Sequence, residues 1–408
     1  MRIVVTGMGV VSPLGNDIAQ FWSAVCSGKS GIRTVSEYDP SMQITRFGGI
    51  AETPKVHGLS PEDLAARSRY MLLAMAAADQ AWKQSGLDLS EADPYRYGTY
   101  LGASMADLEA YANAFQALFD EGPRAMPKLT APAVLKNVPA GILASRHGCK
   151  GPNKAIVSAC ASGSHAIGDA AMLIRAGRAD AMLAVSTEAP IFPATFAMFN
   201  ALNALSTRNE APESASRPFD LERDGFVLAE GAGAMVLESE AHAQERGAEI
   251  LAELAGYGQT CDAYHIFRPD PTGAGAAACM RQALRDAEAD PDDVGYINAH
   301  ATGTPMGDRA EALAIQQVFP EAQPWVSSTK AILGHLAAAA GAVEAIVAAL
   351  AVRYGVVPPQ MNCDHPDPEC AIRLAPAYKT EGRIDLALSN SFGFGGTNAV
   401  LAFRPYPR

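Results

Sequence analysis

The sequence predicts an α/β protein in which helices cover a largely buried sheet. Short β-branched runs alternate with Ala-rich helical stretches along all 408 residues, a pattern typical of layered α/β folds. Apolar residues make up 49% of the chain and no segment has a disordered composition. We therefore expect a compact body rather than small domains on a flexible linker.

Each expected element follows from a local pattern of apolar residues and breakers. The expected strands are residues 3–6, 155–159, 182–185, 234–237, 296–299, 386–389 and 400–403. The expected helices are residues 64–84, 162–176, 274–287, 309–318 and 336–354. The polar, Pro-containing segment 206–224 is predicted to be a surface loop.

The chain is expected to divide into two halves, residues 1–250 and 251–408. Each half pairs a strand with an Ala-rich buried helix, in residues 155–176 and 325–354. This similarity indicates a duplication, although so weak a repeat does not establish one.

Charge and cysteine usage exclude some classes of protein. The net charge of −12 disfavours nonspecific binding to nucleic acid or to an anionic membrane, since both require a positive surface. Seven cysteines without a disulfide-framework spacing, and an N-terminus without signal-peptide features, favour a reduced cytoplasmic protein. The apolar stretch 336–352 contains Glu344 and is Ala-rich, so we interpret it as a buried helix rather than a membrane span.

Three distant segments supply one thiol and two imidazoles: VSACASGSH around Cys160, INAHATGT around His300 and TKAILGH ending at His335. A reactive Cys with two His from remote parts of a chain suggests thioester chemistry. Cys160 follows an apolar strand and begins a helix, where the helix dipole can lower the pKa of a thiol from about 8.5. Taken alone, the same Cys fits an inert structural role.

Both histidines are expected at the ends of secondary-structure elements. His300 is expected where a strand leaves the sheet, and His335 follows Lys330 at the start of an Ala-rich helix. A zinc site is a weaker account because the chain has no CxxC and no HExxH spacing.

The segment SNSFGFGGTN, residues 389–398, places glycines around Phe392 and Phe394 directly after a strand. Such a loop can aim backbone N–H groups at a developing oxyanion, worth roughly 2.7 to 4 kcal/mol per donor in acyl transfer. The opening GMGVVS has Ser12 where a dinucleotide fingerprint needs its third Gly, so no NAD site is expected.

Together these motifs resemble the β-ketoacyl-acyl-carrier-protein synthases, the condensing enzymes of fatty-acid and type II polyketide synthesis. The resemblance covers almost the whole chain. It includes VVTGMGVVSPLG, STRN, SRPFDLERDGFVLAEGAG and DAYH in the family's order, besides the segments above. It implies the thiolase fold, with two similar halves in a five-layered α-β-α-β-α arrangement, normally a dimer.

The resemblance also implies roles for individual residues. Cys160 is similar to the acyl-accepting nucleophile, and His300 and His335 to the pair that decarboxylates the malonyl thioester. Lys330 matches an active-site lysine. The N–H groups of Cys160 and Phe394 would form the oxyanion hole, and Phe394 would gate entry of the second substrate.

Other positions are expected to contact substrate. Thr302 and Thr304 match contacts to the phosphopantetheine arm of the carrier, and we place Phe392 in the substrate site. Bulky side chains that fit an acyl tunnel, or equally a packed core, are Met105, Phe196, Met198 and Phe199. Basic residues that fit a docking patch for an acidic carrier, or ordinary solvated charges, are Arg67, Arg69, Arg124, Lys128 and Lys136.

Two departures from the family's pattern bear on the substrate. Ala301 follows His300 where a Gly is usual, and Asn203 stands before ALSTR where chain-elongating bacterial enzymes often carry a basic residue.

The leading function is therefore a 3-oxoacyl-acyl-carrier-protein synthase of fatty-acid elongation, acting as a homodimer with acyl carrier protein. The alternative is a type II polyketide or polyene ketosynthase, acting with or without a chain-length-factor partner. A catalytically silent partner subunit is disfavoured because Cys160, His300 and His335 are all retained. No metal or bound cofactor is expected, since the phosphopantetheine arrives on the carrier.

Overall fold

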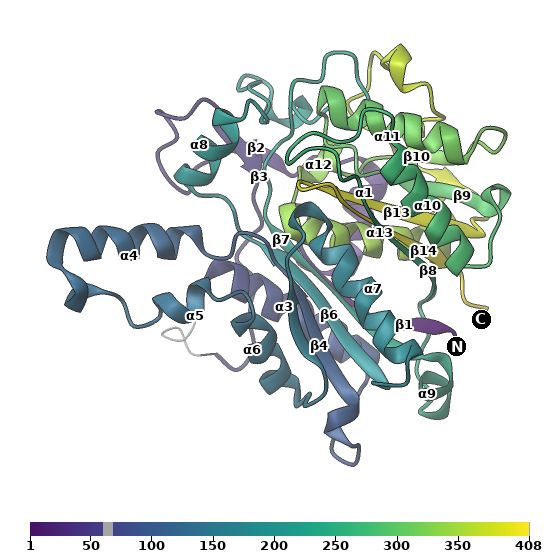
Figure 1. The fold of residues 1–408 in the computed structure, drawn as a ribbon, viewed down its shortest axis with the longest axis horizontal. Helices are drawn as coiled ribbons and strands as arrows, with labels where there is room; N and C mark the ends of the chain where they lie inside the picture. Colours follow the sequence, from purple (N-terminus) through teal and green to yellow (C-terminus); the bar gives the residue numbers. More distant parts are fainter. Residues whose placement is uncertain (60–67, 408) are drawn as a thin grey trace.

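The computed structural model describes residues 1–59 and 68–407, and within them the framework is one sheet of ten strands (Figure 1). The first five strands of the sheet along the chain are β1 (Ile3–Val11), β4 (Tyr97–Gly102), β5 (Asn153–Ile156), β6 (Ala181–Glu188) and β7 (Gly231–Ser239). The second five are β8 (Ala252–Cys261), β9 (Val294–Asn298), β10 (Trp325–Ser327), β13 (Leu386–Gly393) and β14 (Thr397–Arg404). Two small ladders pair β2 (Ile32–Thr34) with β3 (Phe47–Gly49) and β11 (Val356–Val357) with β12 (Thr380–Glu381).

The two sets of five strands have the same topology. Their spatial orders are β1-β7-β6-β4-β5 and β8-β14-β13-β9-β10, which is first-fifth-fourth-second-third in both sets. In each set the last three strands of this order run parallel, and the other pairs are antiparallel. The sets join where β1 pairs with β8. The repeated order and direction support the duplication that the sequence only suggests; the boundary after residue 250 stays a prediction.

Helices complete a five-layered arrangement. The outer layers are α3 (Arg69–Ser85) with α6 (Val138–His147), and α10 (Ala274–Asp286) with α11 (Pro305–Val318). The central layer is α7 (Ser162–Arg175) with α13 (Ala340–Tyr354), and each of these helices contacts strands of both sets. The remaining helices are α1 (Ile18–Ser27), α4 (Leu108–Glu121), α5 (Thr130–Val134), α8 (Pro193–Ala201), α9 (Glu240–Glu245) and α12 (Lys330–Leu333).

Small residues let the two central helices approach closely. A Cβ at Gly163 would lie 2.6 Å from the backbone N of Ala342, and one at Gly341 would lie 2.5 Å from Ser164 Oγ. The stretch Ala337–Tyr354 is long and apolar enough to cross a membrane, but 89% of it is buried inside the protein. This burial agrees with the interpretation of the stretch as a core helix.

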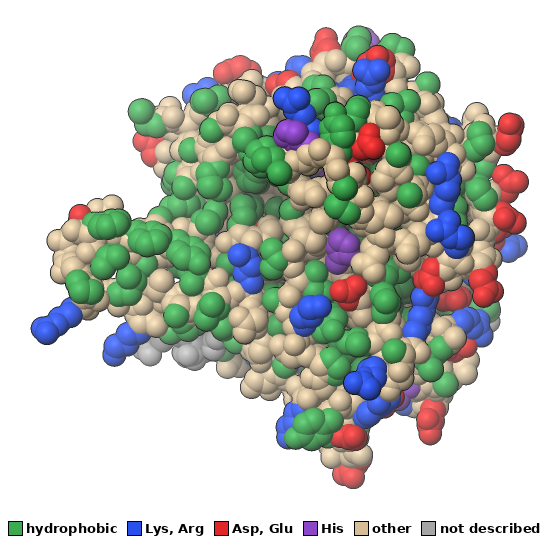
Figure 2. Space-filling view, viewed as in Figure 1, with side chains coloured by type: hydrophobic (Ala, Val, Ile, Leu, Met, Phe, Trp, Pro, Cys, Tyr) green, Lys and Arg blue, Asp and Glu red, His purple; other side chains and the backbone are tan. Residues whose placement is uncertain are grey.

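Helix α4 projects from the body of the molecule together with α5 (Figure 1). Its exposed face carries Tyr111, Phe115 and Phe119, which stack in sequence at centroid distances of 6.2 and 6.3 Å. Figure 2 shows hydrophobic side chains on this arm and in the hollow between it and α8. We call α4 and α5 with these aromatic residues the α4 arm.

The structure differs from the expected elements in several places; the helix expected from residue 336, for example, begins only at Ala340, after a short 3-10 turn. Residues 215–220, expected in a surface loop, are buried, because Phe219 enters a core cluster and Arg217 pairs with Asp220 and Asp364. The strand expected at 155–159 ends at Ile156 because the chain turns there towards α7. Helix α3 begins at Arg69; the expected start at residues 64–67 lies outside the described residues.

Candidate active site

Cys160 lies in a tight turn between β5 and α7. The turn depends on Ala159, which adopts a left-handed φ of 49°, a conformation that costs a non-Gly residue energy and is often found at functional sites. The second half repeats the turn before α13, where Ala337 has a φ of 48° and Ala338 stands in the place of the cysteine. The two halves therefore share the same turn conformation, but only the first half has a cysteine in this turn.

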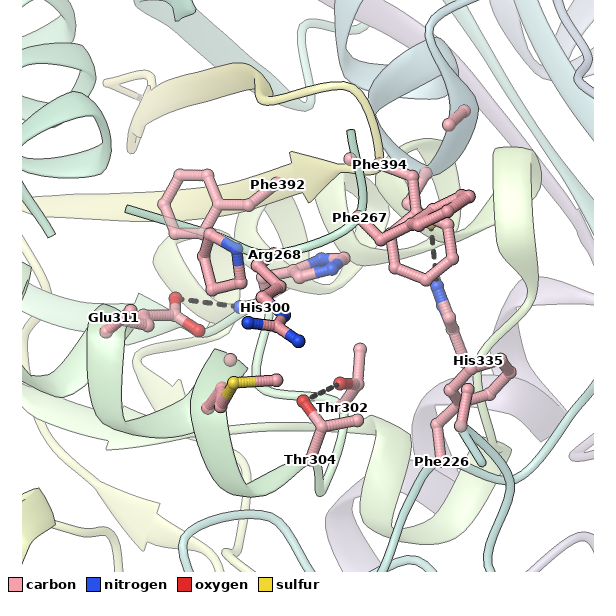
Figure 3. Close-up of a pocket in the computed structure, with 18 of the residues that line it drawn as sticks. Phe226, Phe267, Arg268, His300, Thr302, Thr304, Glu311, His335, Phe392 and Phe394 are labelled. Atoms are coloured by element: carbon pink, nitrogen blue, oxygen red, sulfur yellow. Dashed lines mark hydrogen bonds between the residues drawn. The ribbon is translucent and has the colours of Figure 1, made fainter. Parts of the chain in front are cut away.

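The thiol and the two imidazoles converge. Nε2 of His335 lies 3.0 Å from Sγ of Cys160, and a nitrogen of His300 completes a cluster whose atoms are all within 4.8 Å of one another (Figure 3). The two imidazole rings meet edge to face, with centroids 5.4 Å apart. The three segments that the sequence singles out thus form one site.

Both histidines are held through their backbones. The carboxylate of Glu311, on α11, accepts hydrogen bonds from the N–H of His300 (2.9 Å) and of Ala301 (2.7 Å), and from Asn390 Nδ2 (2.9 Å). The backbone N–H of His335 donates to the carbonyl of Val227 at 2.7 Å. These contacts fix the backbone position from which each imidazole side chain extends.

The hydrogen-bond partners of the two ring nitrogens indicate which tautomer each imidazole adopts. Nδ1 of His300 and of His335 is buried and has no hydrogen-bond partner among the described residues. A proton on Nε2 lets His335 donate to the sulfur of Cys160, whereas a proton on Nδ1 would be a buried donor without an acceptor. We therefore assign the Nε2–H form to both rings.

Burial governs the ionisation of the site. It raises the pKa of the Cys160 thiol to about 11, although the charge of Lys330 and the N–H of Phe394 each lower it. A position at the start of a helix can lower the pKa of a thiol, but here burial is the largest influence and raises the pKa of Cys160. Burial also holds the pKa of both His300 and His335 well below the usual 6.5, and Lys330 lowers both further. At rest the cluster is a neutral thiol with neutral imidazoles.

Lys330 lies behind the cluster and does not line the cavity. Its side chain is 1% exposed and forms an ion pair with Glu344 of α13, which is fully buried. A buried cation acts on the site through its field, which is stronger in a low-dielectric interior.

A cavity of about 750 Å³ opens onto the cluster. Most residues expected to touch substrate line it: Met105, Cys160, Phe199, His300, Thr302, Thr304, His335, Phe392 and Phe394. The hydroxyl oxygens of Thr302 and Thr304 lie 3.2 Å apart, and Phe394 is 38% exposed and packs edge-on against Phe267 at 5.8 Å. Phe196 and Met198 do not line it, because Phe196 is buried in a separate core cluster and Met198 faces solvent.

The sequence does not single out Glu311 or Arg268 as residues of the site. Glu311 looks like an ordinary charge on α11, and only the fold shows that it is buried. Arg268 is the only Lys or Arg among the described residues that line the cavity, whose lining also includes Thr302 and Thr304 (Figure 3). The DAYH segment just before Arg268 was a signal that could have pointed to its loop.

The candidate docking residues lie apart from this cavity. Arg69 is committed to Glu230, with nitrogen-oxygen distances of 2.6 and 2.8 Å, which leaves it poorly suited to a carrier. Arg124 and Lys128 are exposed near the α4 arm, and Lys136 is partly buried. Arg67 lies outside the described residues.

The Cys160, His300 and His335 atoms are close enough to be considered as metal ligands. Tetrahedral zinc, with bonds of about 2.3 Å to S and 2.0 Å to N, would hold two ligands roughly 3.5 Å apart. The 3.0 Å between Sγ and Nε2 is instead a hydrogen-bond distance. The geometry therefore fits direct thiol-imidazole contact better than shared metal ligation.

Family models and curated relatives match nearly the whole chain. The model "Beta-ketoacyl synthase, N-terminal domain" matches residues 1–243, and "Beta-ketoacyl synthase, C-terminal domain" matches residues 251–364. A 3-oxoacyl-[acyl-carrier-protein] synthase 2 of Vibrio cholerae is 43% identical over 99% of both chains. The enzyme of that name from Coxiella burnetii is 42% identical over 98% of this chain and 97% of its own. The chain belongs to the β-ketoacyl synthase family of condensing acyltransferases.

Solved structures agree with this assignment. A β-ketoacyl synthase from Burkholderia phymatum superposes with a TM-score of 0.93 at 32% identity, covering 100% of both chains. A chain of AntDE:AntF, a type II polyketide acyl-carrier protein in complex with its ketosynthase, gives 0.91 at 34% identity, covering 100% of this chain and 99% of that one. The ishigamide ketosynthase/chain length factor gives 0.91 at 30% identity with the same coverage. The expected thiolase-type fold is confirmed.

Proposed function

We propose that this protein is a 3-oxoacyl-acyl-carrier-protein synthase that elongates fatty acyl chains. The observation that carries the proposal is the convergence of one thiol and two neutral imidazoles at a cavity that is also lined by Thr302, Thr304 and Arg268. The names of the curated relatives give the substrate class.

In the first half-reaction, Cys160 Sγ attacks the thioester carbon of an acyl-carrier protein. The carbon-sulfur bond to the carrier breaks, and the proton of the Cys160 thiol ends on the released carrier thiol. The backbone N–H groups of Cys160 and Phe394 would stabilise the oxyanion, and the lowering effect of the Phe394 N–H on the pKa of Cys160 supports this role. Because the thiol is neutral at rest, it must lose its proton as it attacks.

In the second half-reaction, a malonyl-carrier thioester binds with its carbonyl oxygen towards Nε2–H of His300 and His335. Loss of CO2 leaves an enolate, whose charge these two donors stabilise. The enolate carbon then attacks the acyl-Cys carbonyl, a carbon-carbon bond forms, and the Cys160 sulfur leaves. Neutral imidazoles are the donors required, and the depressed pKa values keep them neutral at physiological pH.

A polyketide or polyene ketosynthase is the second candidate. It is favoured by the superposition on AntDE:AntF and on the ishigamide enzyme. The two candidates differ in what they make, so product analysis separates them.

We also propose that the chain acts as a homodimer in the cytoplasm with an acyl carrier protein as partner, which supplies the phosphopantetheine. The α4 arm exposes aromatic side chains, and β5 is an uncovered strand at the end of the sheet, whereas residues 373–375 hydrogen-bond to β10 at the other end. A second copy of the chain would cover both the exposed aromatic side chains of the α4 arm and the open edge of β5. The seven free cysteines fit a reducing compartment.

Incubation with an acyl-carrier protein and malonyl-carrier protein tests the proposal. We expect release of CO2 and a 3-oxoacyl product two carbons longer than the acyl donor. A product extended many times by malonyl units without reduction would favour the polyketide candidate, and release of free acid alone would contradict both.

A further inference from the structure

A buried carboxylate lies behind the wall of the active-site cavity. Glu188 ends β6, is 0% exposed, and accepts hydrogen bonds from the backbone N–H of Ser104 (3.0 Å) and of Met105 (3.2 Å). The hydroxyl of Ser104 also donates to it, and the backbone N–H of Ala338 helps to lower its pKa. All of these donors are neutral, so the carboxylate is held without a recorded ion pair.

These donors come from two distant segments that both border the cavity. Ser104 and Met105 lie in the link from β4 to α4 and line the cavity, while Ala338 follows Ala337, another lining residue. Ser186, two residues before Glu188 on the same face of β6, connects the same two segments. Its hydroxyl is 2.8 Å from the carbonyl of Gly102 and 2.7 Å from that of Ala338. The end of β6 thus connects the cavity wall at Ser104 and Met105, in the first half of the chain, to the turn at Ala337 and Ala338 in the second half.

Stability alone does not explain this carboxylate. Burying an uncompensated carboxylate is costly, and burial raises the pKa of Glu188 although its hydrogen bonds oppose the shift. The link that it holds is also strained, because Ala106, directly after Met105, has a left-handed φ of 58°. A costly group that holds a strained segment of cavity wall indicates a functional constraint on the position of that wall.

We propose that Glu188 is a positioning residue that fixes Met105 in the cavity wall and thereby sets which acyl chains the site accepts. The inference rests on the proposed condensing function. Met105 has a long, flexible side chain whose place depends on its backbone, and Glu188 holds that backbone. Met105 and Cys160 line the same cavity, so a long acyl chain on the sulfur has more of that wall to contact than an acetyl group does.

The test compares acyl-chain preference in Glu188→Gln. This substitution keeps the shape but replaces one acceptor oxygen with an NH₂ group that faces N–H donors. We expect the ratio of kcat/KM for a long-chain acyl-carrier protein to that for acetyl-carrier protein to change by about tenfold or more. The ratio is the readout because the charge of Glu188 also raises the pKa of the Cys160 thiol, and its removal acts equally on the rates with both substrates.

Two further variants show whether the effect passes through Met105. Glu238→Gln is the matched control, because Glu238 is also 0% exposed but is held by Thr6, His242 and Arg246 away from the cavity. It should lower the melting temperature without moving the ratio. In a Met105→Ala background, Glu188→Gln should cause little further change in the ratio, because both substitutions act on the same contact.

Several results would overturn the inference. One is an unchanged ratio in folded Glu188→Gln, another an equal shift in Glu238→Gln, and a third a full effect that persists without Met105. If Glu188→Gln does not fold, Ser104→Ala, which removes only the hydroxyl donor, should shift the ratio in the same direction, and no shift would count against it. A wild-type enzyme that makes no 3-oxoacyl product would instead overturn the proposed function.

Discussion

Two influences oppose each other at the sulfur of Cys160. Its position before α7 and near Lys330 favours the thiolate, whereas burial disfavours any charge, and burial prevails with a pKa of about 11. A thiol that is neutral at rest is protected from oxidation and alkylation, since the thiolate is the reactive form. We infer that the bound substrate and the N–H of Phe394 stabilise negative charge only when the reaction needs it.

The rate of alkylation of Cys160 by iodoacetamide should therefore keep rising with pH. Because the folded thiol has a raised pKa, the thiolate fraction grows about tenfold per pH unit from neutral pH to pH 10. Mass spectrometry of the Cys160 peptide measures the rate, and the unfolded chain, with a thiol pKa of about 8.5, is the reference. A plateau below pH 9 in the folded protein would contradict the neutral resting thiol.

Arg268 is expected to bind the phosphate of the phosphopantetheine arm, because it is the one Lys or Arg among the described lining residues and forms no ion pair with another described residue. Arg268→Gln should raise KM about tenfold for an acyl-phosphopantetheine thioester but leave KM unchanged for the acyl-pantetheine thioester, which has no phosphate. Arg281→Gln is a control, since Arg281 donates to Gln317 outside the cavity. Equal effects of Arg268→Gln on both thioesters would contradict a phosphate contact.

At the scale of elements, α12 and α13 are joined by the buried pair of Lys330 and Glu344. Lys330→Met leaves the carboxylate of Glu344 without its partner and should lower the free energy of unfolding by about 3 to 5 kcal/mol. Adding Glu344→Leu should recover most of that stability, but not activity, because the positive charge near Cys160 is still missing. Urea unfolding and single-turnover acylation measure the two effects; full activity in the stable double variant would show that the charge is dispensable.

Much of the fold could be predicted from the sequence, because buried strands and Ala-rich helices leave strong apolar patterns. All seven expected strands coincide with observed strands, although 155–159 ends early. The ladder that joins β1 to β8 could not be predicted, because pairing between distant strands leaves no local pattern. The burial of 215–220 was missed because its charges, such as Arg217 and Asp220, look like solvated ones until their partners are known.

The site residues that could be predicted from the sequence, namely Cys160, His300 and His335, lie at the ends of strands or helices. Glu311 and Glu188 were missed for a different reason. Each holds backbone N–H groups of another segment, and a sequence does not show which backbone a carboxylate will meet. Glu344, a charge inside an apolar helix, was the one visible sign of this buried network.

For the molecule as a whole, the α4 arm predicts self-association. Phe115 is 51% and Phe119 80% exposed, more apolar surface than a projecting helix keeps in water without a partner. Phe115→Glu with Phe119→Glu should convert the proposed dimer to a monomer in sedimentation velocity. Tyr95→Glu, which changes an exposed aromatic residue outside the arm, should leave the dimer intact. A double variant that stays dimeric would place the interface elsewhere.

The central claim is that Cys160 accepts the acyl group and that the two imidazoles act only in the second half-reaction. The most direct test is mass spectrometry of the purified protein after exposure to acyl-carrier protein and then malonyl-carrier protein, in the wild type and in Cys160→Ala, His300→Ala and His335→Ala. We predict an acyl adduct on Cys160 in the wild type and both His variants, elongation in the wild type alone, and no adduct in Cys160→Ala. An adduct on another residue, or elongation by a His variant at the wild-type rate, would contradict the account.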